Sequence, residues 1–256
     1  MSLKETLRYR RWQAGVWQPF YRILWGFFNG VRFVGQPGYR ARLLTAWRYP
    51  TQQHQHSTFT LPDRYPDLFG YLRQYLGSRP RPKLLSFGCS TGEEVDTLGR
   101  YLPQADILGA DINHWCIGQA RQRWGAQPRY AFMHSCSAAF EQATDFDAIC
   151  CLAVFQHPHN RHNPARTTSA WPFAQFEAQL HLLDQKLKPG GLLLIDQCDF
   201  NFLDVAPALR ARYRPAPWPG NLTRRDRPLF NRNDQKMAPQ HVAFRVFIKN
   251  EGSYQA

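Results

Sequence analysis

The sequence predicts an α/β fold, a doubly wound and mostly parallel sheet with helices on both faces. Two observations support this prediction. From about residue 62 onward, short apolar runs alternate with segments of helical pattern. The runs AICCLAV and LLLI are apolar almost throughout, as strands buried on both faces require. Strands that alternate with helices of this length also predict right-handed βαβ units.

Each element follows from its own pattern, in chain order. A helical pattern over 66–76 is closed by Gly77. The breaker cluster RPRP then introduces an apolar run that ends in Gly88, which predicts a strand. Further helices are expected at 92–102, 114–124 and 171–187, and further strands at 106–112, 129–134, 146–154 and 191–197. Near the end, 241–249 alternates apolar with polar side chains and predicts an antiparallel C-terminal edge strand.

The first sixty residues form a segment of their own, dense in aromatic and basic side chains. We expect residues 1–60 to be an N-terminal helical extension or lid, followed by a main domain of residues 61–256. Apolar residues recur at the spacing of one helical face, with Pro19 limiting where that helix begins, at Trp17, Phe20, Tyr21, Leu24 and Phe28. This stripe is expected to pack against its own domain; the alternatives are a lid over a substrate or a helix on a membrane surface.

The net charge of the chain indicates its class of partner, and its hydropathy indicates its compartment. The chain carries 32 Lys and Arg against 19 Asp and Glu, a net charge of +13, with the basic excess in 1–48 and 205–236. Such an excess indicates a polyanionic partner, for example nucleic acid, an anionic membrane surface or a phosphorylated substrate. The sequence shows no apolar window of transmembrane length and no signal-peptide pattern. We therefore expect a cytoplasmic protein without a transmembrane segment, for which peripheral membrane contact stays open.

The stretch LLSFGCSTGEE, residues 84–94, is the first candidate for a binding site. In an open parallel sheet, ligands bind beyond the carboxyl ends of the strands, where a tight strand-to-helix turn lets backbone amides approach. Gly88 and Gly92 are expected to permit that approach, since a Cβ would hold the ligand off. Asp111 ends the next strand, where a carboxylate accepts both hydroxyls of a ribose. A cofactor that contains a nucleoside is implied.

The glycine spacing and the charge of this loop indicate which kind of nucleoside cofactor it binds. Its glycine spacing is neither G-x-G-x-x-G nor G-x-x-x-x-G-K-[ST], so the loop is poorly suited to a pyrophosphate or triphosphate. Glu93 and Glu94 would repel an anion and attract a cation. The sulfonium and the α-amino group of S-adenosylmethionine have the required charge.

The loop resembles the first motif of class I S-adenosylmethionine-dependent methyltransferases, typically acid-x-Gly-x-Gly-x-Gly. Here that stretch has Ser86 in place of the acid and Ser90 in place of the middle glycine. GCSTGEE is very similar to the loop of chemotaxis-receptor methyltransferases, which carry the same departures. The class resemblance covers roughly residues 80–200, where 146–157 resembles the fourth motif and 187–196 the turn and fifth strand. It implies a Rossmann-like fold with a seven-stranded sheet.

The resemblance also implies a set of cofactor contacts. We expect S-adenosylmethionine to be bound by the following residues: Gly88, Cys89, Ser90, Thr91, Gly92, Glu93, Asp111, Ile112, Ser135, Cys136, Leu152 and Ala153. After the third strand, the family usually has an acid near the adenine. This chain has Ser135, Cys136 and Ser137 there instead.

Methyl transfer is an in-line displacement, so alignment and exclusion of water are the main contributions of the protein. A base is needed only for a nucleophile that binds protonated, and His157, just beyond the fourth strand, is the catalytic candidate. A packing or turn-capping role for His157 is the alternative. No metal site is expected, because the spacing of His157, His159 and His162 is not helical and no cysteine pair supports it.

The six cysteines, residues 89, 116, 136, 150, 151 and 198, contain no CxxC pair and are expected to be reduced, mostly buried thiols. RNA cytosine-5 methyltransferases use cysteines at strand ends as nucleophiles. Cys150 and Cys151 instead lie inside their strand, which favours a role in the core.

The segment after the fifth strand is where the class usually binds its methyl acceptor. Residues 199–234 follow the fifth strand and are rich in Arg, Pro and aromatics. Tyr213, Trp218 and Phe230 could stack on RNA or could anchor a solvated loop to the core. Without a nucleic-acid module, a small molecule or a saccharide or lipid-linked metabolite is favoured. The alternatives are an RNA or protein methyltransferase that uses the basic flanks, and a non-catalytic nucleoside-binding module; the sequence leaves the oligomeric state open.

Overall fold

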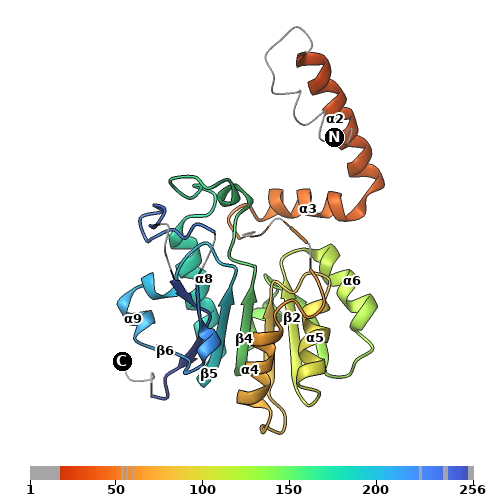
Figure 1. Cartoon of the computed structure of the whole chain (residues 1–256). Coiled ribbons are helices and arrows are strands. Elements are labelled where there is room, and N and C mark those ends of the chain that lie inside the picture. Colours follow the sequence, from red (N-terminus) through yellow and green to blue (C-terminus); the bar gives the residue numbers. More distant parts are fainter. Residues whose placement is uncertain are drawn as a thin grey trace.

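The computed structural model describes residues 18–52, 55, 57–58, 60–224, 227–238 and 242–252, and its centre is a seven-stranded sheet (Figure 1). The strand order is β3-β2-β1-β4-β5-β9-β6. The strands are β1 Lys83–Phe87, β2 Asp106–Asp111, β3 Tyr130–His134, β4 Phe146–Leu152, β5 Leu187–Asp196, β6 Tyr213–Pro215 and β9 Val246–Lys249. Strands β1 to β5 pair in parallel, and β9 pairs antiparallel with both β5 and β6. The Rossmann-like, mostly parallel sheet predicted from the sequence is confirmed.

Helices cover both faces of this sheet, as a doubly wound fold requires. The helices of the domain are α4 Pro66–Leu76, α5 Glu93–Tyr101, α6 His114–Trp124, α7 Ala138–Gln142, α8 Phe173–Lys186 and α9 Pro207–Arg210. One core cluster joins the strands to α4, α5 and α6, and the other joins them to α7, α8 and α9. Within β4, Cys150 belongs to one cluster and Cys151 to the other, and both are fully buried. Both thiols are therefore core groups, as expected.

The C-terminal part of the sheet refines the prediction. The expected antiparallel strand is present, but the alternating run is interrupted at Arg245 into β8 (Val242–Phe244) and β9. Strand β8 pairs with β7 (Leu222–Arg224) in a separate two-stranded sheet, and β6 lies on the outer side of β9. Sequence reasoning missed β6, because three residues are too short to show a period.

The N-terminal extension contains helices α2 (Gln18–Gly35) and α3 (Pro37–Arg48). Helix α3 packs on α6, where a Cβ on Gly38 would lie 3.2 Å from the Trp115 ring, and α2 packs on α3. None of the residues of α2 is buried, and α2 points away from the domain (Figure 1). The expected packing of the apolar stripe against the domain is therefore not observed for its described members. Trp17 lies outside the described residues.

No helix in the described part of the chain is long and apolar enough to cross a membrane.

A buried charge cluster fixes the last strands against α8. The Lys249 ammonium, fully buried, lies 3.2 Å from Asp184 Oδ1 and donates to the carbonyls of Asp184 and Leu187 at 2.6 and 2.8 Å. Tyr213 donates its hydroxyl proton to Asp184 at 2.8 Å, and Arg212 lies 2.6 Å from the other carboxylate oxygen. Burial lowers the pKa of Lys249, so the ammonium depends on Asp184 as its counter-ion.

We predict that Asp184→Ala lowers the free energy of unfolding by about 3–5 kcal/mol, because it removes the carboxylate beside the buried Lys249 ammonium. Urea unfolding measures the change. Asp106→Ala is the control, since Asp106 pairs with the exposed Arg81 and its loss should cost at most about 1 kcal/mol. Equal losses in the two variants would contradict the role given to the buried cluster.

Candidate functional site

A cavity of about 390 Å³ opens at the carboxyl ends of β1, β2 and β4. Loops after these strands form one wall. The other wall comes from the cover segment, which we define as residues 49–65, with 53–54, 56 and 59 outside the described residues. The cavity is lined by Gln52, Gln55, Ser57, Thr58, Thr60, Leu61, Asp63, Arg64, Tyr65, Phe69, Phe87, Gly88, Cys89, Ser90, Glu94, Thr97, Ala110, Asp111, Ile112, Asn113, Ser135, Leu152, Ala153, Val154, Gln156, Arg161 and Arg227. It lies where the strand pattern predicts a ligand site.

The loop after β1 has a left-handed backbone at Gly88 (φ +78°), Ser90 (φ +50°) and Gly92 (φ +93°). A Cβ on Gly88 would lie 2.3 Å from Cγ2 of Val154, and one on Gly92 would lie 2.6 Å from the Trp124 ring. These glycines are therefore required by the backbone conformation and by the chain's own packing. The expectation that a Cβ there would also hold a ligand off stays a prediction.

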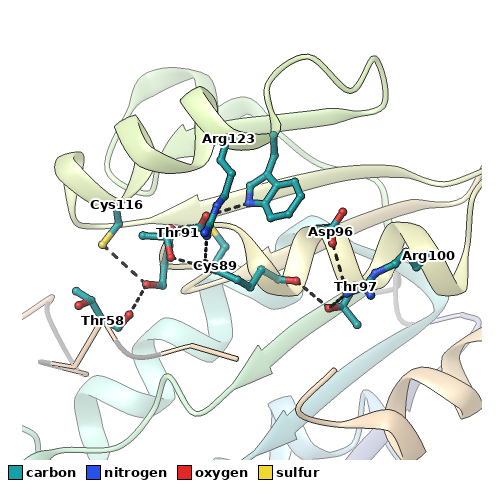
Figure 2. Close-up of polar contacts among 11 residues, drawn as sticks. Thr58, Cys89, Thr91, Asp96, Thr97, Arg100, Cys116 and Arg123 are labelled. Carbon is teal, nitrogen blue, oxygen red and sulfur yellow. Dashed lines mark hydrogen bonds and ion pairs between the residues drawn. The ribbon is translucent and has the colours of Figure 1, made fainter. Parts of the chain in front are cut away.

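The outer half of the loop faces away from the cavity. Thr91 donates its hydroxyl proton to Glu93 at 2.7 Å, and Glu93 forms an ion pair with Arg123 (Figure 2). The Trp124 indole N–H donates to the carbonyl of Thr91 at 3.2 Å. Thr91, Gly92 and Glu93 were predicted as cofactor contacts, but none of them lines the cavity. They instead attach the loop to the end of α6.

Asp111 lines the cavity at the end of β2. Its Oδ2 accepts a hydrogen bond from the backbone N–H of Ser90 at 2.9 Å, and its Oδ1 accepts one from the N–H of Asn113 at 2.8 Å. Burial raises the pKa of this carboxyl, and these N–H groups oppose the increase. A carboxylate has about four acceptor positions, so both oxygens retain capacity for further donors.

Glu94, rather than Glu93, brings a second carboxylate to the cavity. Ser86 donates its hydroxyl proton to Glu94 at 2.8 Å. Glu94 therefore supplies a carboxylate beside the position where the resembling family has its acid. Burial raises the pKa of Glu94 to about 7, while the Ser86 hydrogen bond and the Arg64 charge oppose the increase. Neighbouring helical residues point about 100° apart, so only one of these two acids can face the strand end.

The cavity end near β3 is polar and contains a buried donor. Ile112, Asn113 and Ser135 line it, whereas Cys136, also predicted as a cofactor contact, is exposed and lies outside the cavity lining. Asn113 Oδ1 caps α6 by accepting the backbone N–H groups of Trp115 and Cys116. The Asn113 Nδ2 group, in contrast, is buried without a hydrogen-bond partner among the described residues. Such a group is typical of a site that a polar ligand completes.

The segment after β4 closes the cavity from the other side. Leu152 and Ala153, two of the expected cofactor contacts, line it together with the buried Gln156. Gln156 donates to the carbonyl of Ala153 at 3.0 Å and accepts a hydrogen bond from Arg227 at 3.2 Å. Arg227 and Arg161 also line this end, so it combines an amide with two cationic side chains. Sequence reasoning missed these three residues as site residues.

His157 does not line the cavity. Its backbone N–H donates to Asp199 at 2.7 Å, and its ring Nδ1 accepts the N–H of His159 at 3.2 Å, which caps the 3₁₀ turn η1 (Pro158–His162). The geometry thus agrees with the capping alternative and gives no support to the predicted base. Among the described residues, no group of three His, Cys, Asp or Glu is arranged to hold a metal ion.

The cover segment crosses the cavity and is hydrogen-bonded to the loops after β1 and β4. Gln55 donates its side-chain amide to the carbonyl of Ala153 at 3.3 Å. Ser90 donates its hydroxyl proton to the carbonyl of Thr58 at 2.9 Å (Figure 2). Sequence reasoning did not identify this role, because the polar run TQQHQHST has no period that could indicate it.

Three aromatic residues considered for RNA stacking are engaged within the protein. Phe230 is fully buried and Tyr213 is 7% exposed. Trp218 stacks on Tyr71 with ring centroids 5.0 Å apart. They therefore anchor the segment after β5 to the core.

The strand order and the position of the cavity define a Rossmann-like α/β protein with a ligand site at the carboxyl edge of its sheet. A family described as a methyltransferase domain matches residues 60–234, more than half of the chain, and the chain belongs to this family. The predicted similarity of the loop to chemotaxis-receptor methyltransferases stays a prediction.

Individual relatives are more distant. An uncharacterized protein of Synechococcus sp. is 30% identical over 135 residues, which are 51% of this chain and only 29% of that protein. The chain therefore spans less than a third of this relative. Among solved structures, N-methyltransferase NodS of Bradyrhizobium japonicum is 15% identical with a TM-score of 0.43, covering 74% of this chain and 99% of that one. A methyltransferase of Thiobacillus denitrificans, solved with S-adenosylhomocysteine, is 21% identical with a TM-score of 0.35, covering 59% of this chain and 52% of that one.

We predict that Gly88→Ala lowers the free energy of unfolding by about 1–3 kcal/mol, from the left-handed φ and the contact with Val154. In a Val154→Ala background the loss should be smaller, because the steric part is removed. Gly118→Ala, in α6 with open space around it, is the control and should be neutral or stabilising. Equal effects of Gly88→Ala in both backgrounds, measured by urea unfolding, would contradict the assigned contact.

Proposed function

We propose that the chain is an S-adenosylmethionine-dependent methyltransferase whose cofactor occupies the cavity at the ends of β1, β2 and β4. The observation that carries this proposal is the pair of carboxylates, Asp111 and Glu94, that line one cavity from different elements. Membership of the methyltransferase domain family supports it. A cofactor bearing phosphates would meet two acidic groups here, whereas a cationic nucleoside is attracted.

The ribose is proposed to bind at Asp111. Both carboxylate oxygens are oriented by backbone N–H groups of Ser90 and Asn113, so the side chain is fixed before a ligand arrives. The remaining acceptor positions suit the two ribose hydroxyls. Asn113 Nδ2, a buried donor without a partner in the described chain, and Ser135 are proposed to bind the adenine.

The methionine end is proposed to bind near Glu94. Its carboxylate attracts the sulfonium and the α-ammonium, while Arg64 in the same cavity suits the α-carboxylate. Tyr65 also lines the cavity, and its hydroxyl is buried without a hydrogen-bond partner in the described part of the chain. Burial raises its pKa, so it stays protonated and can donate a hydrogen bond there. These three groups complement a zwitterionic amino acid that carries one additional positive charge.

When bound, S-adenosylmethionine supplies an activated methyl group for in-line displacement. The chain contributes alignment of the acceptor and exclusion of water by the cover segment. No described histidine lines the cavity, so the proposal gives His157 a capping role in place of a catalytic one. A base is needed only for an acceptor that binds protonated.

The acceptor is proposed to be a small molecule or a saccharide or lipid-linked metabolite with an anionic or strongly polar group. Arg161, Arg227 and Gln156 line the cavity beyond β4 and suit such a group. RNA is less favoured, because Tyr213, Trp218 and Phe230 pack within the protein.

Calorimetric titration with S-adenosylmethionine and S-adenosylhomocysteine tests the proposed site. Glu94→Gln and Asp111→Asn are each expected to weaken binding of S-adenosylmethionine by about 1–3 kcal/mol, since each removes a charged partner. Glu93→Gln is the matched control, because this neighbouring acid pairs with Arg123 outside the cavity. Absence of binding to the wild type, or an effect of Glu93→Gln as large as that of Glu94→Gln, would overturn the assignment.

The pH dependence of affinity provides a separate prediction. With a pKa of about 7, Glu94 is mostly ionised at pH 8 and mostly protonated at pH 6. Protonation removes the negative charge, so affinity for S-adenosylmethionine should fall by about tenfold from pH 8 to pH 6. Titrations across this range measure it, and Glu94→Gln should flatten the profile. The same slope in both proteins would show that another group titrates.

A further inference from the structure

Helix α2 presents an apolar stripe that no part of the described chain covers. The stripe recurs every three or four residues and comprises Ile23 (71% exposed), Phe27 (72%), Val31 (55%) and Val34 (76%). Helix α3 also exposes large apolar side chains, Leu43 (40%), Leu44 (49%) and Trp47 (79%). Exposed apolar surface of this kind marks an interaction site.

The opposite side of α2 is the side that contacts α3. Tyr39 of α3 donates its hydroxyl proton to Asn29 Oδ1 at 2.9 Å. The guanidinium of Arg32 lies 4.0 Å from the centre of the Tyr39 ring. Since α3 is seated on α6 through Gly38 and Trp115, these contacts hold α2 by its other side and leave the stripe exposed. Helix α2 itself points away from the domain (Figure 1).

The charge of the two helices indicates what covers the stripe. Residues 18–48 contain five arginines, at positions 22, 32, 40, 42 and 48, and no Asp or Glu. The occupant must therefore combine an apolar region with negative charge. A second copy of the same surface would bring arginine against arginine, which is unfavourable. A bilayer containing anionic lipid supplies both properties.

We propose that the α2–α3 arm, residues 18–48, docks on an anionic membrane surface. Helix α2 lies in the interface with its stripe among the acyl chains, and the exposed Arg22 and Arg48 contact lipid headgroups. The aromatic residues of the arm suit this depth, since aromatic rings favour the membrane interface.

The arm leads directly into the cover segment, so docking brings the membrane close to the cavity wall that contains Gln55 and Thr58. This step rests on the proposed function. A methyltransferase held in this way would take its acceptor from the bilayer, which favours a lipid-linked acceptor over the other classes proposed.

Co-sedimentation of the full chain with vesicles tests the docking. Wild type is expected to bind vesicles containing phosphatidylglycerol at least about tenfold more tightly than vesicles of phosphatidylcholine alone. Ile23→Asp with Phe27→Asp should abolish binding to both. Arg22→Gln with Arg48→Gln, at two exposed positions, should reduce the preference for phosphatidylglycerol.

Leu182→Asp is the matched control, because Leu182 is 53% exposed on α8 and should leave vesicle binding unchanged. Circular dichroism checks that each variant is folded, and titration with S-adenosylmethionine measures cofactor binding in the cavity separately.

A wild type that binds vesicles but does not bind S-adenosylmethionine would overturn the proposed function alone. Failure of wild type to bind phosphatidylglycerol vesicles, or full binding by the Asp variant, would overturn the docking. A dimer in light scattering that Phe27→Asp dissociates, without vesicle binding, would assign the stripe to a second copy.

Discussion

The site depends on how the loop after β1 is attached to the end of β2. The N–H groups of Gly88 and Cys89 both donate to the carbonyl of Ala110, at 2.7 and 3.1 Å. The N–H of the next residue, Ser90, donates to the Asp111 carboxylate. The same turn therefore fixes the backbone of the loop and orients the acid that faces the cavity. The left-handed conformation at Gly88 and Ser90 is what brings three successive N–H groups to one strand end.

The two halves of this loop have different roles. Its outer half is fastened to α6 by the ion pair of Glu93 with Arg123 and the hydrogen bond from Trp124. Its inner half, Gly88 to Ser90, lines the cavity. Glu94, in the first turn of α5, also lines the cavity and accepts a hydrogen bond from Ser86 of β1. One acid thus stabilises the loop while its neighbour provides the charge of the cavity. Such a division explains how a first motif without its usual acid can still present a carboxylate at the strand end.

Most of the sheet could be predicted from the sequence, because strands buried on both faces must be continuously apolar. Asp111 and Gly88 were predictable too, since strand ends fix their place. The choice of Glu94 over Glu93 was not, because it depends on the rotation of α5 about its axis. Gln156 and Arg227 are far apart in sequence, and only the folded chain brings them together. His157 matched a catalytic pattern, but its ring is used to cap a turn.

We propose that the cavity holds S-adenosylmethionine with its ribose at Asp111 and its methionine end near Glu94. A crystal structure of the full chain with S-adenosylhomocysteine is the decisive experiment. We expect ribose hydroxyls within about 3 Å of the Asp111 oxygens and the amino group on the side of Glu94. Ligand density elsewhere, or a reversed ligand with its adenine against Glu94, would contradict it.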